Sequence, residues 1–310
     1  MPRVVCLAGG VGGAKLAEGL QAELGDELTV IVNTADDGER HGLLVCPDHD
    51  TVMYTLAGIE NPETGWGIAG DTWAAMAALE RYGEAGWFRL GDQDLATHIV
   101  RTARLRDGER LTVVCRALQA ALGVRATILP MTDEPVRTLV RTDDGWLEFQ
   151  DYFVRLRQAP DVREVRFGGI EAAQPTSEVV AALDAAAAIV IAPSNPIVSV
   201  APILMVPGMT DALATARARG ARIVAISGIV GGKALKGPAD RMLASLGLEP
   251  TALGVASGYA GLIDTFVVDT VDATLAPAIE ALGLRVVVVD TIMTDDDSRA
   301  RLARDILAAL

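Results

Sequence analysis

The sequence predicts an α/β protein with a Rossmann-like, doubly wound and mostly parallel sheet and a smaller inserted α+β lobe. Half of the 310 residues are hydrophobic but only 4% are aromatic. The core must therefore consist mainly of Ala, Val, Leu and Ile, which suits a parallel sheet covered by helices. Short apolar runs alternate with segments of helical periodicity. A chain of this length is also expected to carry a second lobe.

Net charge and cysteine content narrow the class of protein. The formal charge of −14 argues against a nucleic-acid partner, which would need a basic face. Cys6, Cys46 and Cys115 are scattered without metal-ligand spacing, as is typical of reduced thiols in the cytosol. The sequence shows no leader pattern and no apolar run long enough to span a bilayer. We expect a cytoplasmic protein with no membrane partner.

The first strand, residues 3–8, ends in the glycine-rich loop Gly9–Lys15, and leucines at helical spacing follow. A strand, a glycine loop and a helix aim backbone N–H groups at phosphate. The spacing fits neither a P-loop, which would have Gly at Ala14, nor the dinucleotide fingerprint, which would have Gly at Lys15. We interpret the segment as a variant phosphate loop, with an ordinary tight turn as the alternative.

The second strand, residues 28–32, runs into an acidic stretch that spans residues 33–50. Carboxylates beyond the carboxyl end of a parallel strand are well placed to hold a cation or a polar ligand. The alternative is a solvated loop whose Asp and Gly residues form turns and caps. In that case Asp50 would be the N-cap of a helix over residues 51–58.

The middle of the chain is expected to complete the first half of the sheet. Helices are predicted up to Tyr82 and over residues 94–104, where His98 is interpreted as a packing residue. Strands are predicted over residues 111–116 and 125–129, joined by a helix over residues 117–122.

A different pattern begins at residue 131, where apolar and polar residues alternate and aromatic residues become frequent. Asp143-Asp144-Gly145 predicts a hairpin between strands 138–142 and 146–150. We therefore divide the chain into a core of residues 1–130 and 179–310 and an inserted lobe of residues 131–178.

The parallel α/β pattern returns after the lobe. Strand 186–192 ends in Pro193-Ser194-Asn195-Pro196, whose prolines stiffen the loop. Strand 222–227 ends in a second loop rich in glycine and lysine, residues 227–237. The remaining expected elements are helix 238–246, strands 265–269 and 285–290, and helix 297–310.

Four strand-end loops thus carry polar or glycine-rich chemistry, and a doubly wound sheet would gather them at one edge. Glycine N–H groups and lysines suit phosphates, and carboxylates suit Mg²⁺, which takes one or two of them plus substrate oxygens. No Ser-His-Asp or Cys-His pairing is evident in the sequence. Metal-assisted transfer at phosphorus is therefore the favoured reaction class.

The whole chain resembles the 2-phospho-L-lactate transferases of deazaflavin coenzyme F-420 biosynthesis. The matching segments are residues 8–16, 32–37, 47–56, 66–68, 90–98, 128–133, 149–153, 193–196 and 236–240. The resemblance implies a Mg²⁺-dependent enzyme that moves a phospho-organic-acid group from a guanosine-diphosphate-linked donor to the ribityl hydroxyl of the deazaflavin Fo. GMP would be released, and the protein would be a homodimer.

On this resemblance we expect Asp48 and Asp50 to be catalytic and, together with Asp37, to hold the metal. Which aspartate is the base and which the ligand stays open. The expected substrate-binding residues are Gly10, Gly12, Gly13, Lys15, Asn33, Thr34, Asp36, Asp37, His41, Asp92, Gln93, Ser194, Asn195, Ser227, Gly231, Gly232 and Lys236.

Two positions depart from the family pattern. Gln93 stands where the family usually has Arg at a position implicated in Fo binding, and His49 stands where Leu is usual. These departures bear on substrate contacts more than on the reaction, and the donor acid is left open among lactate, enolpyruvate and glycerate. The alternative function is that of the related regulatory proteins of cell shape and gluconeogenesis, which bind nucleotide sugars without turnover. An NAD-dependent oxidoreductase would need the dinucleotide fingerprint that is absent here.

Overall fold

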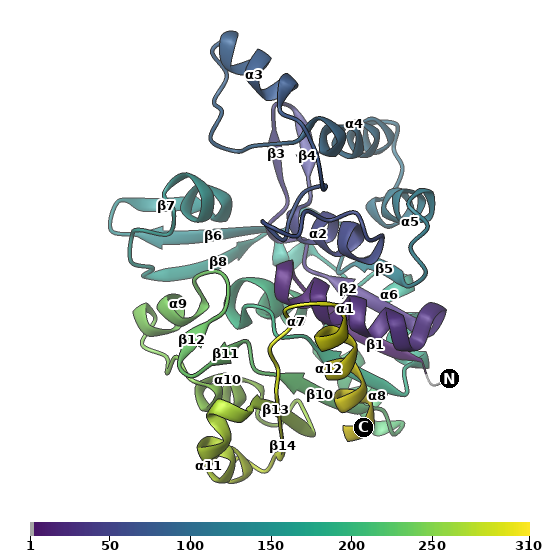
Figure 1. Ribbon diagram of the computed structural model, residues 1–310, viewed down its shortest axis with the longest axis vertical. Coiled ribbons are helices and arrows are strands. Elements are labelled where there is room, and N and C mark those ends of the chain that lie inside the picture. The colour runs from purple at the N-terminus through teal and green to yellow at the C-terminus, as the bar shows by residue number, and fades with distance from the viewer. Residues whose placement is uncertain (1–2) are drawn as a thin grey trace.

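A seven-stranded parallel sheet forms the centre of the molecule, which the computed structural model describes from residue 3 to residue 310 (Figure 1). Its strands are β1 (Val4–Ala8), β2 (Leu28–Val32), β5 (Thr127–Pro130), β9 (Ala188–Ile191), β10 (Arg222–Ile226), β13 (Thr265–Asp269) and β14 (Arg285–Val289). Their order is β14-β13-β10-β9-β1-β2-β5, and all neighbours are parallel. From β1 the chain adds β2 and β5 on one side of the sheet, and it then adds β9, β10, β13 and β14 on the other side. This order confirms the predicted doubly wound α/β fold.

Helices cover both faces of this sheet (Figure 1). The helices of the described chain are α1 (Gly10–Leu24), α2 (Pro47–Leu56), α3 (Ala74–Arg81), α4 (Asp92–Arg106), α5 (Leu111–Ala121), α6 (Ser177–Ala185), α7 (Ala201–Met205), α8 (Met209–Ala218), α9 (Ala239–Ser245), α10 (Ala252–Tyr259), α11 (Ala276–Glu280) and α12 (Asp296–Ala309). Helices α1, α2 and α12 pack on one face, and α6, α7, α8, α10 and α11 pack on the other.

The sequence of β1 shows why both faces are covered. Val4, Cys6 and Ala8 belong to the apolar cluster beneath α1 and α12, whereas Val5 and Leu7 belong to the cluster on the opposite face. Successive side chains of a strand point to opposite faces, so a strand that is apolar at every position must be buried on both sides.

Smaller sheets extend from this core. Strands β6 (Arg137–Thr142), β7 (Gly145–Glu148) and β8 (Glu164–Gly168) form an antiparallel sheet in the order β7-β6-β8. The pairing of β6 with β7 confirms the predicted hairpin at Gly145. Two short hairpins are formed by β3 (Gly38–Arg40) with β4 (Leu43–Val45) and by β11 (Ile229–Val230) with β12 (Lys233–Ala234). The β3–β4 hairpin and α3 project from the core at the top of Figure 1.

Residues 111–116 were predicted as a strand, and this prediction is wrong. The segment belongs to α5, whose buried residues Leu111, Val114 and Cys115 recur at helical spacing. The start of this helix is held by Asp133, whose Oδ1 accepts hydrogen bonds from the N–H and the hydroxyl of Thr112, both at 2.7 Å. A run of β-branched residues favoured a strand, but this distant cap and the helical burial pattern decide the structure.

The last residues of the acidic stretch 33–50 also differ from the alternative in which Asp50 is a helix N-cap. Helix α2 begins at Pro47, and the N–H of Asp50 donates to the carbonyl of Cys46 at 2.9 Å. Asp50 therefore lies within the first helical turn and is not the N-cap. Proline is favoured at the first helical position, because a backbone N–H at that position has no partner within the helix and its absence costs nothing. Helix α4 similarly begins at Asp92, two residues before the predicted start.

Between residues 3 and 310, no single helix is long and apolar enough to cross a membrane. The segments Pro196–Met205 and Met209–Ala218 meet the test of length and composition only as a pair, which is bent by 78°.

Candidate active site

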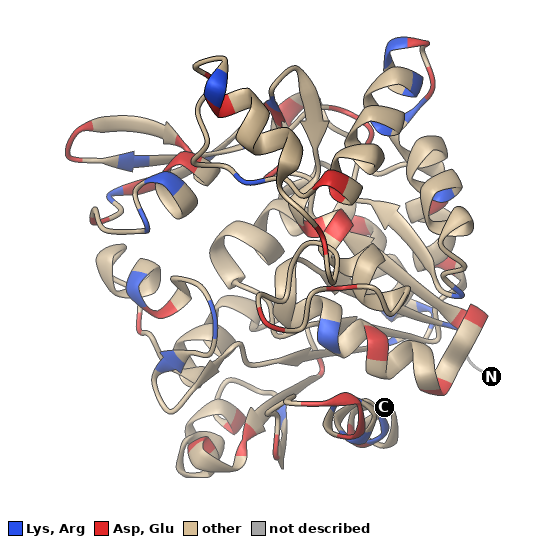
Figure 2. Cartoon of the chain, turned by 45° about the horizontal axis from the view of Figure 1, so that its top comes forward, with Lys and Arg blue, Asp and Glu red and all other residues tan. Residues whose placement is uncertain are grey.

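One cavity of about 490 Å³ opens at the carboxyl edge of the central sheet. The loops after β1, β2, β9 and β10 all contribute to its wall, so the predicted convergence of four loops is confirmed. The predicted site residues in the lining are Gly10, Gly12, Lys15, Asp36, Asp48, Asp50, Ser194, Asn195, Ser227 and Lys236. Acidic residues gather near the centre of the view in Figure 2. The cavity lies where the direction of strand addition reverses, the usual place for a ligand in such a sheet.

Close approach of neighbouring segments explains the glycines after β1. A Cβ atom at Gly9 would lie 2.6 Å from Oδ2 of Asp48 and 2.7 Å from Cβ of Ser199. A Cβ atom at Gly12 would lie 2.6 Å from the carbonyl oxygen of Pro193. The glycines therefore let the start of α1 sit directly against α2 and the Pro193 loop.

Asp48 and Asp36 form a pair of buried carboxyl groups beside this loop. Asn33 Nδ2 donates to Oδ2 of Asp48 at 2.9 Å, which orients that carboxylate from the end of β2. Burial raises the pKa of Asp48 to about 6, against the lowering effect of hydrogen bonds from Asn33 and Gly10. Burial and the neighbouring Asp48 raise the pKa of Asp36 well above its usual value. Oδ1 of Asp36 is buried without a hydrogen-bond partner.

Asp50 has the opposite electrostatic environment. Burial alone would raise its pKa, but the Arg101 guanidinium and two nearby histidines hold the pKa of this carboxyl well below its usual range. Arg101 Nη1 donates to Oδ2 of Asp50 at 3.0 Å, and Nη2 bonds to the other oxygen. Asp50 is therefore an ionised, fully paired carboxylate, whereas Asp48 is bonded mainly to neutral groups.

A group that could hold a metal ion lies next to Asp50. One ligand atom each from Asp50, Asp94 and His98 lie within 4.8 Å of one another, and all three residues are buried. Asp94 was not among the predicted site residues, and His98 was interpreted as a packing residue. The signal was their spacing of four residues, which places both on one face of α4. Asp37, which was expected to bind the metal, does not line the cavity.

Several other predicted residues lie outside the cavity wall and are engaged elsewhere. Asp92 accepts hydrogen bonds from the N–H groups of Ala74 and Ala75 and from the Thr72 hydroxyl, and so caps α3. Gly231 and Gly232 form the turn of the β11–β12 hairpin with φ values of +57° and +74°. The predicted residues outside the wall are Gly13, Asn33, Thr34, Asp37, His41, Asp92, Gln93, Gly231 and Gly232. Their roles in binding stay predictions.

The basic side chains of the wall have no acidic partners. Lys15, Arg89 and Lys236 line the cavity, and within residues 3–310 none of them has a carboxylate oxygen within 4.0 Å. Lys15 donates to the carbonyl of Met293 at 2.8 Å, and Lys236 donates to the carbonyl of Thr64 at 3.0 Å. In a protein with a net charge of −14, three cations without carboxylate partners in one cavity indicate an anionic ligand.

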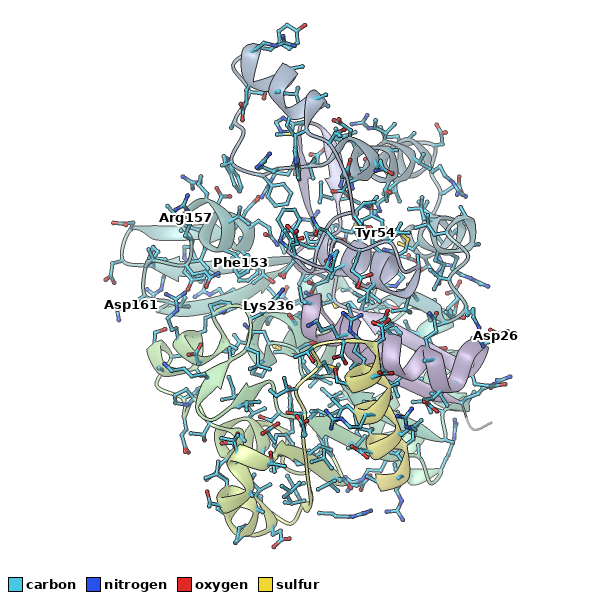
Figure 3. The ribbon with its side chains drawn as sticks, in the orientation of Figure 1. Asp26, Tyr54, Phe153, Arg157, Asp161 and Lys236 are labelled. Atoms are coloured by element: carbon cyan, nitrogen blue, oxygen red, sulfur yellow. The ribbon has the colours of Figure 1, made fainter. Side chains whose placement is uncertain are left out.

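Aromatic side chains line both ends of the cavity. Phe149 and Phe153, from the region of the β7–β6–β8 sheet, stack with ring centroids 5.4 Å apart. Tyr54 approaches from α2, away from Phe153 and Lys236 (Figure 3). Trp66 and Gly67 also line a second cavity of about 380 Å³, and Trp73 is another residue of its wall. These aromatic side chains offer surfaces for flat ring systems in separate parts of the cavity.

Comparison with known proteins identifies the family. The sequence model of the family described as 2-phospho-L-lactate transferase CofD matches residues 4–306. A phosphoenolpyruvate transferase of Kitasatospora aureofaciens is 44% identical over 314 residues, covering 99% of this chain and 97% of its own. A 2-phospho-L-lactate transferase of Methanosarcina mazei is 38% identical over 307 residues, covering 99% and 100%. The chain therefore belongs to the 2-phospho-L-lactate transferase CofD family.

A solved structure supports the fold alone. A UPF0052 family protein of Bacillus halodurans shares 17% identity, aligns over 98% of both chains and has a TM-score of 0.62.

Proposed function

We propose that this chain, as a member of the 2-phospho-L-lactate transferase CofD family, catalyses a step of coenzyme F-420 biosynthesis. It moves a phospho-organic-acid group from a guanosine-diphosphate-linked donor to the ribityl hydroxyl of the deazaflavin Fo and releases GMP. The observation that carries this proposal is the single cavity in which glycine loops and unpaired cations surround buried carboxylates. The regulatory alternative is not favoured, because the relatives that match along nearly the whole chain are named as transferases.

The donor diphosphate is assigned to the glycine loop after β1 and to the two lysines. N–H groups at the start of α1 and the Lys15 and Lys236 ammonium groups are the natural partners of phosphate oxygens. Burial and the nearby cations Arg299 and Lys236 lower the pKa of Lys15, so an added negative charge is favourable here. Both lysines now bond to neutral carbonyls, which a phosphate would replace with a stronger partner.

The two aromatic ends are assigned to the two substrates. The guanosine lies toward Asn195, Phe149 and Phe153, next to the lysine loop. The deazaflavin lies toward Tyr54 and Trp66, where the second cavity extends the space available for a ring system. This arrangement leaves the transferred phosphorus at the centre, beside Asp48 and Asp50.

The chemical step is a substitution at phosphorus. The ribityl oxygen of Fo forms a bond to the phosphorus that carries the organic acid, and the bond from that phosphorus to the bridging oxygen breaks. The bridging oxygen leaves with its electron pair as part of GMP. The hydroxyl proton passes to the carboxylate of Asp48 or Asp50. The chain's contribution is to align the two substrates for this step.

A divalent cation fits the residues present. Asp36 and Asp48 offer carboxylate oxygens at the cavity wall, and Oδ1 of Asp36 has no other partner. Oxygen ligands of this kind suit Mg²⁺, which would supply charge neutralisation at the phosphoryl oxygens. The group of Asp50, Asp94 and His98 contains an imidazole, a ligand that transition metals accept more readily than Mg²⁺.

The test is turnover with defined donors. The protein is incubated with Fo, Mg²⁺ and a guanylylated lactate, enolpyruvate or glycerate, and GMP and the phosphodiester product are measured. Enolpyruvate is the first donor to try, because the relative with 44% identity is named for it. Fo-dependent GMP release with at least one donor is expected. Binding of a nucleotide sugar, without GMP release from any donor, would favour the regulatory alternative.

A further inference from the structure

Asp50 contacts a buried arginine that does not itself line the cavity. We propose that Arg101 is a positioning residue that fixes the orientation of Asp50 and of the neighbouring His98 ring. This inference rests on the proposed function, because the orientation of Asp50 matters for the reaction only if the cavity it lines is the transfer site.

The contact between Arg101 and Asp50 fixes the carboxylate in one orientation. Arg101 lies on α4 and its side chain is 0% exposed. Its two terminal nitrogens bond to the two oxygens of Asp50, and Nη1 also reaches the carbonyl of Leu44 at 3.4 Å. A guanidinium that binds both carboxylate oxygens sets the direction of the carboxylate as well as its charge.

The same nitrogen also contacts the ring of His98. Nη1 of Arg101 lies 3.2 Å from Nδ1 of His98. An arginine can only donate, so a neutral His98 ring would accept at Nδ1 and carry its proton on Nε2. Nε2 lies 3.2 Å from Oδ1 of Asp94 without forming a hydrogen bond, and that oxygen accepts instead from the Tyr54 hydroxyl at 2.8 Å. One buried cation therefore contacts both Asp50 and His98, two residues of the cavity wall.

Stability alone does not account for this arrangement. Taking an arginine and an aspartate out of water costs about as much as their attraction returns, and apolar residues of similar volume often stabilise a core better. A fixed carboxylate at a transfer site has a separate benefit, because a displacement of about 1 Å can cost about 100-fold in rate. The position of Arg101, directly behind cavity-lining atoms, fits the second role.

Kinetics of Arg101 variants provide the first test. Arg101→Lys keeps the charge but cannot bond to both oxygens of Asp50 and to His98 in the same way. We expect kcat to fall by about 10- to 100-fold, with KM for donor and acceptor within about twofold of the parent values. Arg104→Met on the same helix is the matched control, since Arg104 pairs only with the part-exposed Glu109, and its kcat should be unchanged. A parental kcat for Arg101→Lys, or a loss fully explained by a lower folded fraction, would overturn the proposal.

The tautomer of His98 provides a test that needs no turnover. The chain has three histidines, so ¹⁵N-histidine spectra can be assigned with one variant for each. We expect His98 in the parent protein to be protonated on Nε2 and unprotonated on Nδ1, and we expect Arg101→Met to abolish this preference. A proton on Nδ1 of His98 in the parent protein would overturn the proposal. If no donor gives GMP but the tautomer is as expected, only the proposed function fails.

Discussion

Ser194 makes two hydrogen bonds with the peptide groups of Gly9. Its Oγ accepts from the N–H of Gly9 at 3.1 Å and donates to the carbonyl of Gly9 at 2.7 Å. These bonds join the loop after β9 to the loop after β1 at the point where the sheet reverses its order of strand addition. Ser194 was expected to bind substrate directly, and the structure shows that its hydroxyl holds the glycine loop after β1.

Ser194→Ala should therefore destabilise the protein and weaken donor binding together. Loss of the hydroxyl leaves two buried peptide groups of Gly9 without their partner, at a cost of about 1–3 kcal/mol. Urea denaturation should show this loss, and donor KM should rise because the loop is less well fixed. Ser257→Ala removes an exposed hydroxyl that bonds within α10 and should change little. A Ser194→Ala protein as stable as the parent would contradict the structural role.

Gly12→Ala should disturb the same loop by steric overlap. The added Cβ would lie 2.6 Å from the carbonyl oxygen of Pro193, a backbone atom that cannot rotate away. We expect a loss of about 1–3 kcal/mol in the free energy of unfolding, together with weaker donor binding. Gly258→Ala is the control, because its Cβ would meet no atom within 4 Å and alanine favours the helix. Thermal denaturation should thus move in opposite directions for the two variants.

Local sequence patterns were sufficient to predict the sheet and the convergence of its loops. Strands such as Val4–Ala8 are apolar at every position and end in glycine or polar residues, so the rule for strand ends places their loops together. The same local rules failed for residues 111–116, where a run of β-branched residues lies in a helix that Asp133 holds from 21 positions away.

The finer organisation of the site depends on contacts between distant segments. Arg101 pairs with Asp50 across 51 positions, and Asn33 reaches Asp48 across 15. No spacing rule links such residues, because their separation is set by how α2 and α4 pack in three dimensions. A sequence can show which residue types are available for chemistry, whereas pairing and burial decide that Asp48 and Asp50 have opposite electrostatic environments.

Lys236→Met should raise donor KM by about 10-fold or more. The ammonium group has no carboxylate partner within 4.0 Å in the described chain, so its removal should leave the free energy of unfolding nearly unchanged. A bound phosphate would lose a charged hydrogen bond worth about 1.5–3 kcal/mol. The KM of the parent should also rise more steeply with salt than that of the variant. Lys233→Met, three residues away in β12 and with a side chain that is 81% exposed, is the matched control. Equal KM values for both variants would remove Lys236 from the donor site.

Asp48→Asn should abolish most of the activity while the fold survives. The carboxamide can still accept from Asn33, and burial already disfavours the charge at this position. We expect kcat to fall by about 100-fold or more, with a melting temperature close to that of the parent. Asp50→Asn should behave differently, because Arg101 would become an unpaired buried cation at a cost of about 3–5 kcal/mol. Circular dichroism beside GMP release separates the two cases, and near-parental turnover of Asp48→Asn would exclude Asp48 from catalysis.

The pH dependence of stability should report on Asp269, which joins the ends of β13 and β14. Burial raises its pKa, but hydrogen bonds from Val271, Thr291 and Thr270 outweigh this effect and hold the pKa below its usual value. A carboxyl whose folded pKa is lowered stabilises the protein above its unfolded pKa of about 3.9, and this contribution is lost as the pH falls through the folded pKa.

Asp269→Asn should therefore lower the free energy of unfolding by about 1–3 kcal/mol at pH 7, because the carboxamide cannot accept from all of these donors. The difference from the parent should shrink at pH 3 and below, where the parent carboxyl becomes protonated and loses the same interactions. Urea denaturation at both pH values measures the change. Asp161→Asn, an exposed carboxylate with only a loose contact to Arg163, should show no such dependence. The opposite outcome is that the variant and the parent differ in free energy of unfolding by the same amount at pH 7 and pH 3. That result would mean that the shape of the Asp269 side chain stabilises the protein and its charge does not.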